Sequence, residues 1–458
     1  MLITEESHQG PTLGSSPDAK TPRWIDRVKK RLARLMPTTP VLSGCHCPLS
    51  LSSMAGFPTG MRCPRAGLLP AMTPPLGLTT ARNPHPALFR PKTTLSAPDA
   101  PRIHVLGMGS IGTFTAHGLR AMPNPPPVTL LLHRASLADA YRATGRQIRL
   151  ETADGTVIPQ TGYDLEVLRD GHWHGETGPV PSDATNIDHL IVSVKAPQTV
   201  AALTPLRARL SPHSTILFLQ NGCGMIDTVT EHLFPDPTTR PHYAVGVVSH
   251  GVALTQPFHV THTGPAAMSL GRVPPPPGRT PAPARDDDLL ATLPRSPRFN
   301  ARTDAYTQVF QTQLEKLALN AFCNPTCALH DAKTGFLVTM PALRRAILTE
   351  ISAVVLALPE LQGVPGVRER FAIDRLEETV RYILTQNAET TCSMVWDMRA
   401  GRETEVRFIN GYWVRRGREV GVATPVNEEL LQAVLHRTET INLSKMGSVR
   451  SQVNVKLK

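Results

Sequence analysis

Residues 105–112 read VLGMGSIG, and this stretch predicts the fold of the segment around it. It follows a short apolar run and precedes residues 113–122, which contain no proline and many helix-forming residues. The order is therefore strand, glycine turn and helix, as in the first unit of a dinucleotide-binding fold. Gly107 would permit the turn, Gly109 would let a pyrophosphate approach the backbone, and Gly112 would let helix and strand pack closely. The candidate cofactor-binding residues of this turn are Gly107, Met108, Gly109, Ser110, Ile111 and Gly112. On this motif alone, a plain glycine turn is the alternative.

The composition indicates folded domains joined to a basic segment. The chain has 458 residues, 41% of them hydrophobic, which is enough for two or three domains with buried cores. The net charge is +11, but residues 1–100 alone hold twelve Lys and Arg against five Asp and Glu, so the charge does not favour a nucleic-acid partner for the folded part. The seven cysteines include no CxxC pair, so we expect a reducing compartment and no metal site. No run of eighteen apolar residues occurs, and no membrane span is predicted.

Residues 1–100 hold fifteen prolines and predict a disordered, basic, proline-rich leader. The exception is residues 24–36, where apolar and basic side chains fall on opposite faces of a helix. A basic amphipathic helix in an acid-poor leader is typical of a mitochondrial targeting segment, although two glutamates precede it here. The alternatives are a cytoplasmic protein with a disordered tail, and a true start at Met54 or Met72.

A second apolar run, residues 128–132, ends at His133 and Arg134, about twenty residues after the glycine turn. An NAD-specific fold usually places an acidic residue here to bind the ribose hydroxyls. An arginine would instead attract the 2'-phosphate of NADPH, which a carboxylate would repel. The spacing therefore favours NADPH, and the alternative is a surface arginine after a buried strand.

Two further β-prone runs end at polar residues. Residues 189–194 run into Lys195, and residues 215–219 are followed closely by Asn221. In an open parallel sheet, ligands bind beyond the carboxyl ends of the strands. We therefore expect Lys195 and Asn221 to lie near the glycine turn and to bind the cofactor, although either alone would be an ordinary loop residue.

The rest of the chain divides into two domains and a tail. The predicted α/β domain spans residues 101–303 and ends in an exposed proline-rich loop at about residues 273–298. Before that loop, the THTGP sequence of residues 261–265 is expected to form a hairpin turn. The helical domain spans residues 304–445, and a basic tail follows at residues 446–458. The expected helices are residues 306–328, 341–358, 373–385, 403–420 and 425–437.

Three polar residues share one face of the first of these helices. Lys316, Asn320 and Asn324 are spaced four apart between apolar residues. Asparagine is a poor helix-interior residue and is costly to bury without hydrogen bonds. Pro325 follows, and inside a helix it would free a backbone carbonyl and kink the axis. The face is a candidate site, and a polar network inside the core is the alternative.

A second group of polar residues lies near the C-terminus. Its members are Ser393, Asp397, Arg402, Glu405 and Asn410. Glu405 has apolar residues at helical spacing after it, so it is expected to project from the packed side, where a carboxylate needs a partner. These residues are compatible with a reductase, because hydride transfer to a carbonyl carbon leaves charge on the oxygen that a positioned acid must neutralise. Lys316 fits the acid, since burial would lower its pKa, and the asparagine amides would orient the substrate.

Over roughly residues 102–438 the sequence resembles the ketopantoate reductase (2-dehydropantoate 2-reductase) family. The motifs that carry the resemblance are GMGSIG with Arg134, SVK at 193–195, QNG at 220–222, THTG, K-x3-N-x3-NP from Lys316, SM-x2-D-x4-R-x-TE at 393–405, ING at 409–411 and TPxN at 424–427. The resemblance implies a Rossmann NADP-binding domain joined to an all-α domain like that of 6-phosphogluconate dehydrogenase, with the site in the cleft. The chain departs from the family at Cys392, where a serine is common, at Arg407, where an acidic residue is frequent, and at Thr334, where bacterial members often have asparagine.

The resemblance also implies roles for residues. Lys316 would be the general acid, and Glu405 would help to hold substrate and cofactor. The implied substrate-binding residues are Asn221, Asn320, Asn324, Ser393 and Glu405, and the implied NADPH-binding residues are Gly107 to Gly112, Arg134, Lys195 and Asn221. The implied reaction is the NADPH-dependent reduction of 2-dehydropantoate to (R)-pantoate, toward pantothenate and coenzyme A, with a homodimer as one possible assembly. The alternatives are a reductase of another branched 2-oxoacid, and a non-catalytic mitochondrial protein that assists RNA or translation.

Overall fold

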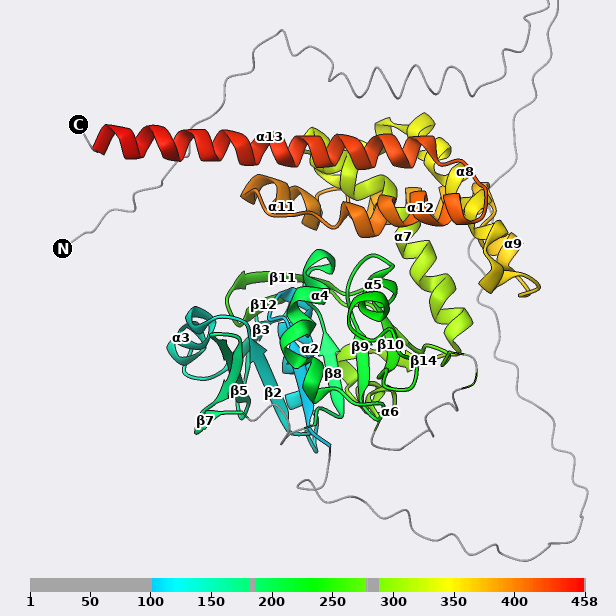
Figure 1. Cartoon of the computed structure of the whole chain (residues 1–458). Coiled ribbons are helices and arrows are strands. Elements are labelled where there is room, and N and C mark those ends of the chain that lie inside the picture. The colour runs from blue at the N-terminus through cyan, green and yellow to red at the C-terminus, as the bar shows by residue number, and fades with distance from the viewer. Residues whose placement is uncertain (1–100, 181–185, 277, 279–287, 457–458) are drawn as a thin grey trace, which may run out of the picture. The chain divides into compact units, whose positions relative to one another are not determined.

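The computed structural model describes residues 101–458 except 181–185, 277, 279–287 and 457–458 (Figure 1). The leader, with its expected helix at residues 24–36, lies outside the described residues. Within them, a domain of mixed strands and helices is followed by a domain built of helices. None of the helices in the described part is both long and apolar enough to cross a membrane.

A ten-stranded sheet forms the first domain. Its strands, in their order across the sheet, are β14 (Ala301–Thr303), β13 (Met268–Arg272), β10 (His242–Val248), β9 (Thr215–Phe218), β8 (His189–Val192), β1 (Ile103–Leu106), β2 (Val128–Leu132), β5 (Asp164–Arg169), β6 (His172–Gly175) and β7 (Gly178–Pro179). The strands from β10 to β5 run parallel to one another. The chain leaves β1 for β2 on one side and later returns to β8 on the other. The carboxyl ends of β1 and β8 therefore flank a topological switch point, where open α/β sheets bind ligands.

Helices cover this sheet. They are α2 (Ser110–Arg120), α3 (Ala135–Ala143), α4 (Thr199–Leu203), α5 (Met225–His232) and α6 (Leu289–Thr292), with 3₁₀ segments η2 (Ala196–Gln198), η3 (Thr204–Arg209), η4 (Leu293–Arg295) and η5 (Pro297–Phe299). Every residue of β1 and β2 is buried, as expected for parallel strands covered on both faces.

A second sheet of four strands holds the THTG motif. Its strands, in order, are β11 (Gly251–Gln256), β12 (His259–Gly264), β3 (Ile148–Glu151) and β4 (Val157–Gln160). The motif lies within β12, so the prediction of a hairpin turn at residues 261–265 is wrong. The reason is that Val260 and His262 are buried in alternation with more exposed threonines, which is the period of a strand. The chain reverses earlier, next to Phe258, which has a φ of +61°.

The predicted exposed loop at residues 273–298 is wrong for its second half. Leu289, Leu290 and Leu293 are buried in the core of the first domain. The prolines in this part, Pro294 and Pro297, stand in the first turns of short 3₁₀ helices, where proline is tolerated. The leucines between Asp288 and η5 can therefore reach the core.

The second domain consists of helices. They are α7 (Tyr306–His330), α8 (Pro341–Ala357), α9 (Val367–Arg370), α10 (Ile373–Gln386), α11 (Ser393–Ala400), α12 (Val406–Glu419) and α13 (Pro425–Lys456), with η6 (Thr334–Thr339) and η7 (Pro359–Leu361). The first turns of α7 pack on β10 and β13, and the helix then contacts α8, α11, α12 and α13 (Figure 1). The backbone of α13 is helical up to Lys456, so the helix extends beyond the predicted end at residue 437 and through most of the segment predicted as a basic tail.

Pro325 lies inside α7, where it leaves the carbonyl of Ala321 without its helical partner. The Nδ2 of Asn410 fills this place by donating to the Ala321 oxygen at 2.9 Å and also donates to Oδ1 of Asn427 at 3.1 Å. Asn427 donates in turn to Oε2 of Glu350 at 2.8 Å. Glu350 closes the network by accepting the first backbone amides of α13. The ING and TPxN motifs therefore stabilise α7 at its proline, through Asn410 and Asn427.

Replacing Asn410 with leucine is expected to destabilise the protein by about 2–4 kcal/mol, because the Ala321 carbonyl and the Asn427 amide would both lose a buried partner. Urea unfolding measures this free energy. The matched control is Asn442→Leu on the exposed part of α13, which should stay within roughly 0.5 kcal/mol of the parent. Equal stability of the two variants would contradict the role given to Asn410.

Candidate active site

The glycine turn between β1 and α2 has three glycines with different surroundings. Gly107 has a φ of +101°, and a Cβ on Gly112 would lie 1.8 Å from the Gly107 oxygen. A Cβ on Gly109, by contrast, would meet no heavy atom within 4 Å. Two glycines are therefore required by the fold itself, while the space at Gly109 is open at the N-terminus of α2. Free amides and the helix dipole favour an anion there, so the turn fits the diphosphate of a dinucleotide.

Ser193 of the SVK motif holds this turn in place. Its Oγ donates to the Gly107 oxygen at 2.7 Å, and its backbone amide donates to Leu106 at 2.9 Å. The SVK motif can be seen in the sequence, but nothing in it indicates this function of Ser193. Its role depends on the pairing of β8 with β1, which joins residues more than eighty positions apart.

Alanine at Gly109 and at Gly112 is expected to have different effects. Gly112→Ala should lower the free energy of unfolding by about 1–3 kcal/mol, because its methyl group would collide with the Gly107 backbone. Gly109 has an extended backbone and open space, so Gly109→Ala should leave stability unchanged and weaken NADPH binding. Urea unfolding and NADPH fluorescence titration measure the two quantities. Tight NADPH binding by Gly109→Ala would show that the cofactor does not approach this turn.

Arg134 lies directly after β2 and is the residue before α3. Its side chain is exposed at the carboxyl end of the strand next to β1. The Arg134 guanidinium is therefore accessible to an anionic group bound at the edge of the sheet where the glycine turn lies.

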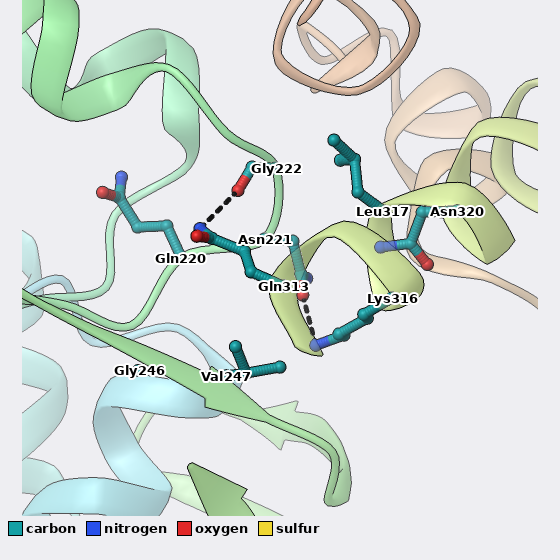
Figure 2. Close-up of a pocket in the computed structure, with 9 residues that line it drawn as sticks. All are labelled: Gln220, Asn221, Gly222, Gly246, Val247, Gln313, Lys316, Leu317 and Asn320. Atoms are coloured by element: carbon teal, nitrogen blue, oxygen red, sulfur yellow. Dashed lines mark hydrogen bonds between the residues drawn. The ribbon is translucent and has the colours of Figure 1, made fainter. Parts of the chain in front are cut away.

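Lys316 is held between the two domains (Figure 2). Its Nζ donates to Oδ1 of Asn221 at 2.8 Å and to the carbonyl oxygen of Val248 at 2.5 Å. Both acceptors lie at carboxyl ends of sheet strands, so the lysine of α7 reaches the edge that carries the glycine turn. Burial lowers the pKa of Lys316 to about 8, although the charge of Glu405 partly opposes this.

A small pocket surrounds the Lys316 ammonium. Its lining residues are Gln220, Asn221, Gly222, Gly246, Val247, Gln313, Lys316, Leu317 and Asn320 (Figure 2). The structure therefore brings three of the predicted site residues, Asn221, Lys316 and Asn320, to one place. Asn324 and Ser393 are not among the lining residues. Asn324 is buried one turn further along α7, and Ser393 is the exposed first residue of α11.

Glu405 is buried against the loop that follows β8. Its carboxylate accepts the backbone amide of Ala196 at 3.2 Å and lies 3.5 Å from Nζ of Lys195. Burial raises the pKa of Glu405, and Lys195 and this amide act in the opposite direction. Helix α12 begins only after Glu405, at Val406, so the predicted helix at residues 403–420 starts too early. Glu405 is thus the residue before α12, and from there its carboxylate contacts the sheet domain at Lys195 and Ala196.

Lys195 is shared between two carboxylates of the helical domain. Its Nζ lies 2.7 Å from Oδ2 of Asp397, closer than to Glu405. Burial lowers the pKa of Lys195, but the charges of Glu405 and Asp397 outweigh it, and the pKa is raised. Asp397 also contacts Arg402 at 3.0 Å. The sequence indicates no role for Asp397, because its partner Lys195 is 202 positions away and comes close only in the folded chain.

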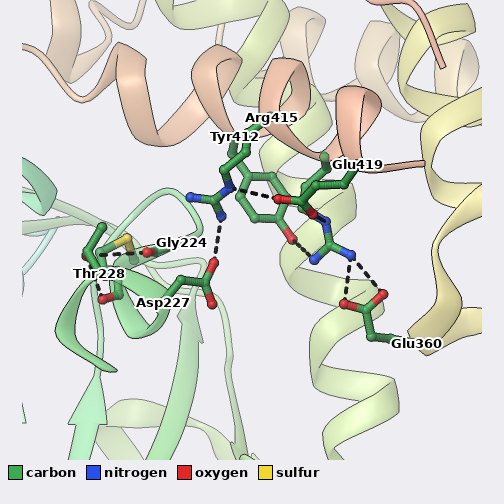
Figure 3. A network of polar contacts seen from close by, with 9 residues as sticks. Gly224, Asp227, Thr228, Glu360, Tyr412, Arg415 and Glu419 are labelled. Atoms are coloured by element: carbon green, nitrogen blue, oxygen red, sulfur yellow. Dashed lines mark hydrogen bonds and ion pairs between the residues drawn. The ribbon is translucent and has the colours of Figure 1, made fainter. Parts of the chain in front are cut away.

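Further polar contacts fix α12 to the sheet domain and to the rest of the helical domain (Figure 3). Arg415 pairs with Asp227 of α5 at 2.6 Å, and the neighbouring Arg416 pairs with Glu360 at 2.7 Å. Glu419 lies within ion-pair distance of both arginines. The backbone amide of Cys223 adds a bond to the helix, donating to a carbonyl of its first turn at 2.9 Å. Helix α12, which begins next to Glu405, is therefore held in a fixed position at the carboxyl ends of the strands.

The site offers an ammonium with a lowered pKa, amide groups and paired carboxylates. In the part of the chain that the structure describes, no group of three or more His, Cys, Asp or Glu side chains could hold a metal ion. Such a set can donate a proton to an oxygen and can bind a carboxylate or a keto group through hydrogen bonds.

Comparisons with known proteins identify the family. The family model described as ketopantoate reductase PanE/ApbA matches residues 103–275, and the model of its C-terminal part matches residues 308–438. A probable 2-dehydropantoate 2-reductase of Schizosaccharomyces pombe is 28% identical, over 72% of this chain and 94% of that protein. Ketoisovalerate reductase BEA2 of Gibberella fujikuroi is also 28% identical, over 76% of this chain and 85% of that protein.

Among solved structures, a PanE/ApbA family ketopantoate reductase from Ralstonia eutropha JMP134 has the same fold. It matches with a TM-score of 0.58 and 22% identity, over 74% of this chain and 99% of the other. The two family models together cover more than half of the sequence and both domains described above. The chain therefore belongs to the ketopantoate reductase family and is an NADP-dependent oxidoreductase.

Proposed function

We propose that this chain reduces 2-dehydropantoate to (R)-pantoate with NADPH. The observation that carries the proposal is the position of Lys316, whose ammonium lies between Asn221 and the Val248 carbonyl at the sheet edge of the glycine turn. When bound, NADPH supplies the hydride for the carbonyl carbon. Gly107 to Gly112, Arg134 and Lys195 would hold it, with Asn221 near its nicotinamide.

Lys316 would donate the proton to the keto oxygen. Its lowered pKa supports this role, because an acid near neutrality releases its proton more readily than an ordinary lysine. The contacts to Asn221 and Val248 fix the direction of the ammonium, so little reorganisation is needed before transfer.

The amide and hydroxyl groups around Lys316 would orient the substrate. Asn320 lines the same pocket, Asn324 lies one turn further along α7, and Ser393 is the first residue of α11, which packs against α7. Glu405 would help to hold the substrate and cofactor, and its contacts with the Ala196 amide and with Lys195 fix its position. Together these groups would bind the carboxylate and keto oxygens of a 2-oxoacid.

The second candidate substrate is another branched 2-oxoacid without the terminal hydroxyl, such as ketoisovalerate. One specific observation favours it. The hydroxyl of Thr334, which by the resemblance described above would replace an asparagine of bacterial members, donates to the carbonyl of Asn387 within the protein. A hydroxyl engaged in this way offers less to a polar substrate tail than a free asparagine amide. The relative from Gibberella fujikuroi is named a ketoisovalerate reductase.

The purified full chain, assayed for NADPH oxidation, decides between these substrates. We expect the kcat/KM for 2-dehydropantoate to exceed that for ketoisovalerate, since one hydrogen-bonded hydroxyl can contribute a large factor to specificity. The reverse order would support the second candidate. No turnover with either compound or with other 2-oxoacids would favour a non-catalytic protein and would refute both enzyme functions.

The rate of reduction is expected to fall as the pH rises through about 8, because Lys316 must carry its proton to act as an acid. The kcat/KM for the 2-oxoacid should therefore be high below this pH and decline with a slope of one proton above it. A pH profile recorded at constant ionic strength measures the effect. A rate that stays constant well above pH 8 would contradict the assignment of the acid.

A further inference from the structure

Three cysteines form a thiol cluster on the face of α7 that carries Lys316 and Asn320, because residues 316, 320, 323 and 327 follow the i, i+4, i+7, i+11 spacing of one helix face. Cys323 and Cys327 lie one turn apart on this helix, and Cys392 is the residue directly before α11. Helix α11, which begins directly after Cys392, packs against α7, and the Sγ of Cys392 lies 3.8 Å from the carbonyl oxygen of Asn324, the residue next to Cys323. The three thiols are close enough to influence one another's pKa. All three are free thiols, and the proposed reaction uses none of them.

Cys392 differs from the other two in access and in environment. It is partly exposed, whereas Cys323 and Cys327 are buried. It also stands at the N-terminus of α11, where the backbone amides and the helix dipole stabilise a thiolate. Hydrogen bonds from the two neighbouring thiols, together with these amides, lower the pKa of Cys392. Cys223 provides a contrast, because it is buried and burial raises its pKa.

We propose that Cys392 is an oxidation site for hydrogen peroxide and that it forms a disulfide with Cys323 or Cys327. In the first step the Cys392 thiolate attacks one peroxide oxygen, the O–O bond breaks, and the products are a sulfenic acid and hydroxide, which takes up a proton. In the second step a neighbouring thiol attacks the sulfenic sulfur, the S–O bond breaks, and water leaves as the disulfide forms. The two cysteines lose two electrons in total, and the peroxide is reduced to two waters.

The disulfide would affect the substrate-binding groups because these are neighbours of the cysteines in the sequence. Cys392 is bonded to Ser393, and Cys323 is bonded to Asn324, so drawing the sulfurs to bonding distance moves residues that flank the proposed 2-oxoacid site. We expect the KM for the 2-oxoacid to rise several-fold while NADPH affinity changes little. This consequence rests on the proposed function, whereas the oxidation itself does not.

Peptide mapping of the full chain tests the oxidation without any need for activity. The protein is treated with hydrogen peroxide, then unfolded and alkylated. We expect Cys392 to be lost to alkylation first, in a cross-linked peptide with Cys323 or Cys327, while Cys223 stays alkylated as the internal control. Cys392 that remains as reduced as Cys223, or that is found linked to another cysteine, would overturn the proposal.

Two variants separate the steps. Cys392→Ser should form no cross-link, and Cys323→Ser with Cys327→Ser should stop at a sulfenic acid that dimedone traps at Cys392. Failure of dimedone to label Cys392 in that variant would count against the first step. In the parent, a rise in KM that dithiothreitol reverses and that Cys392→Ser lacks would support the link to the site. Cross-linking without a change in KM would refute that link alone, and an enzyme inactive before oxidation would refute only the proposed function.

Discussion

Replacing Lys316 with alanine is expected to lower kcat for 2-oxoacid reduction about a thousandfold, because the reaction would lose both its acid and a nearby positive charge. The developing charge on the keto oxygen would then be neutralised only by water or by amide groups. NADPH binding should survive, since the glycine turn lies on a different element from α7. Steady-state kinetics and a fluorescence titration with NADPH measure the two effects.

The matched control is Lys333→Ala. Lys333 is an exposed lysine that follows α7 and pairs with Glu389 at 2.7 Å. An exposed ion pair of this kind contributes little to stability, so kcat should stay within about twofold of the parent. If Lys316→Ala and Lys333→Ala had similar activities, the proton would have to come from another group. A loss of NADPH affinity in Lys316→Ala alone would instead indicate that Lys316 acts mainly on the cofactor.

The glycine turn and the strand ends could be predicted because their signals are local. The VLGMGSIG stretch specifies strand, turn and helix within a few residues, and the positions of Lys195 and Asn221 after apolar runs place them at one edge of a parallel sheet. The spacing of Lys316 and Asn320 likewise puts both on one face of α7, and both line one pocket.

The partners of these residues could not be predicted, since they depend on how the domains pack. Glu405 is paired with the amide of Ala196, 209 positions away, and no local pattern specifies that bond. The Ala321 carbonyl freed by Pro325 could be anticipated, but the donor that satisfies it, Asn410, could not. The prediction made from the THTG motif was wrong for another reason. Its glycine and the following proline favour a turn locally, but the alternating burial of β12 makes the segment a strand.

These long-range pairs also account for the position of the acid. Lys316 can lie at the sheet edge only if α7 keeps its place, and α7 is supported from behind by Asn410 and from the sheet side by β10 and β13. The paired carboxylates at Lys195 and the bond between Arg415 and Asp227 hold α12 over the same strand ends. Stability and activity are therefore coupled in this fold, and variants of the network should be compared at equal fractions of folded protein.

Changing Arg134 to aspartate is expected to raise the Kd for NADPH on the order of a hundredfold and to change the Kd for NADH little, because only NADPH carries the 2'-phosphate that the new carboxylate would repel. Arg134 is exposed beyond β2, so the substitution should not disturb the fold. Titration with both cofactors measures the ratio. The matched control is Arg142→Asp, at an exposed arginine of α3, the helix that follows Arg134; Arg142 pairs with Asp139. It changes the net charge equally, so a general charge effect would appear in both variants, whereas a specific contact would appear only at Arg134. Equal losses for NADPH and NADH in Arg134→Asp would mean that the residue does not bind the 2'-phosphate.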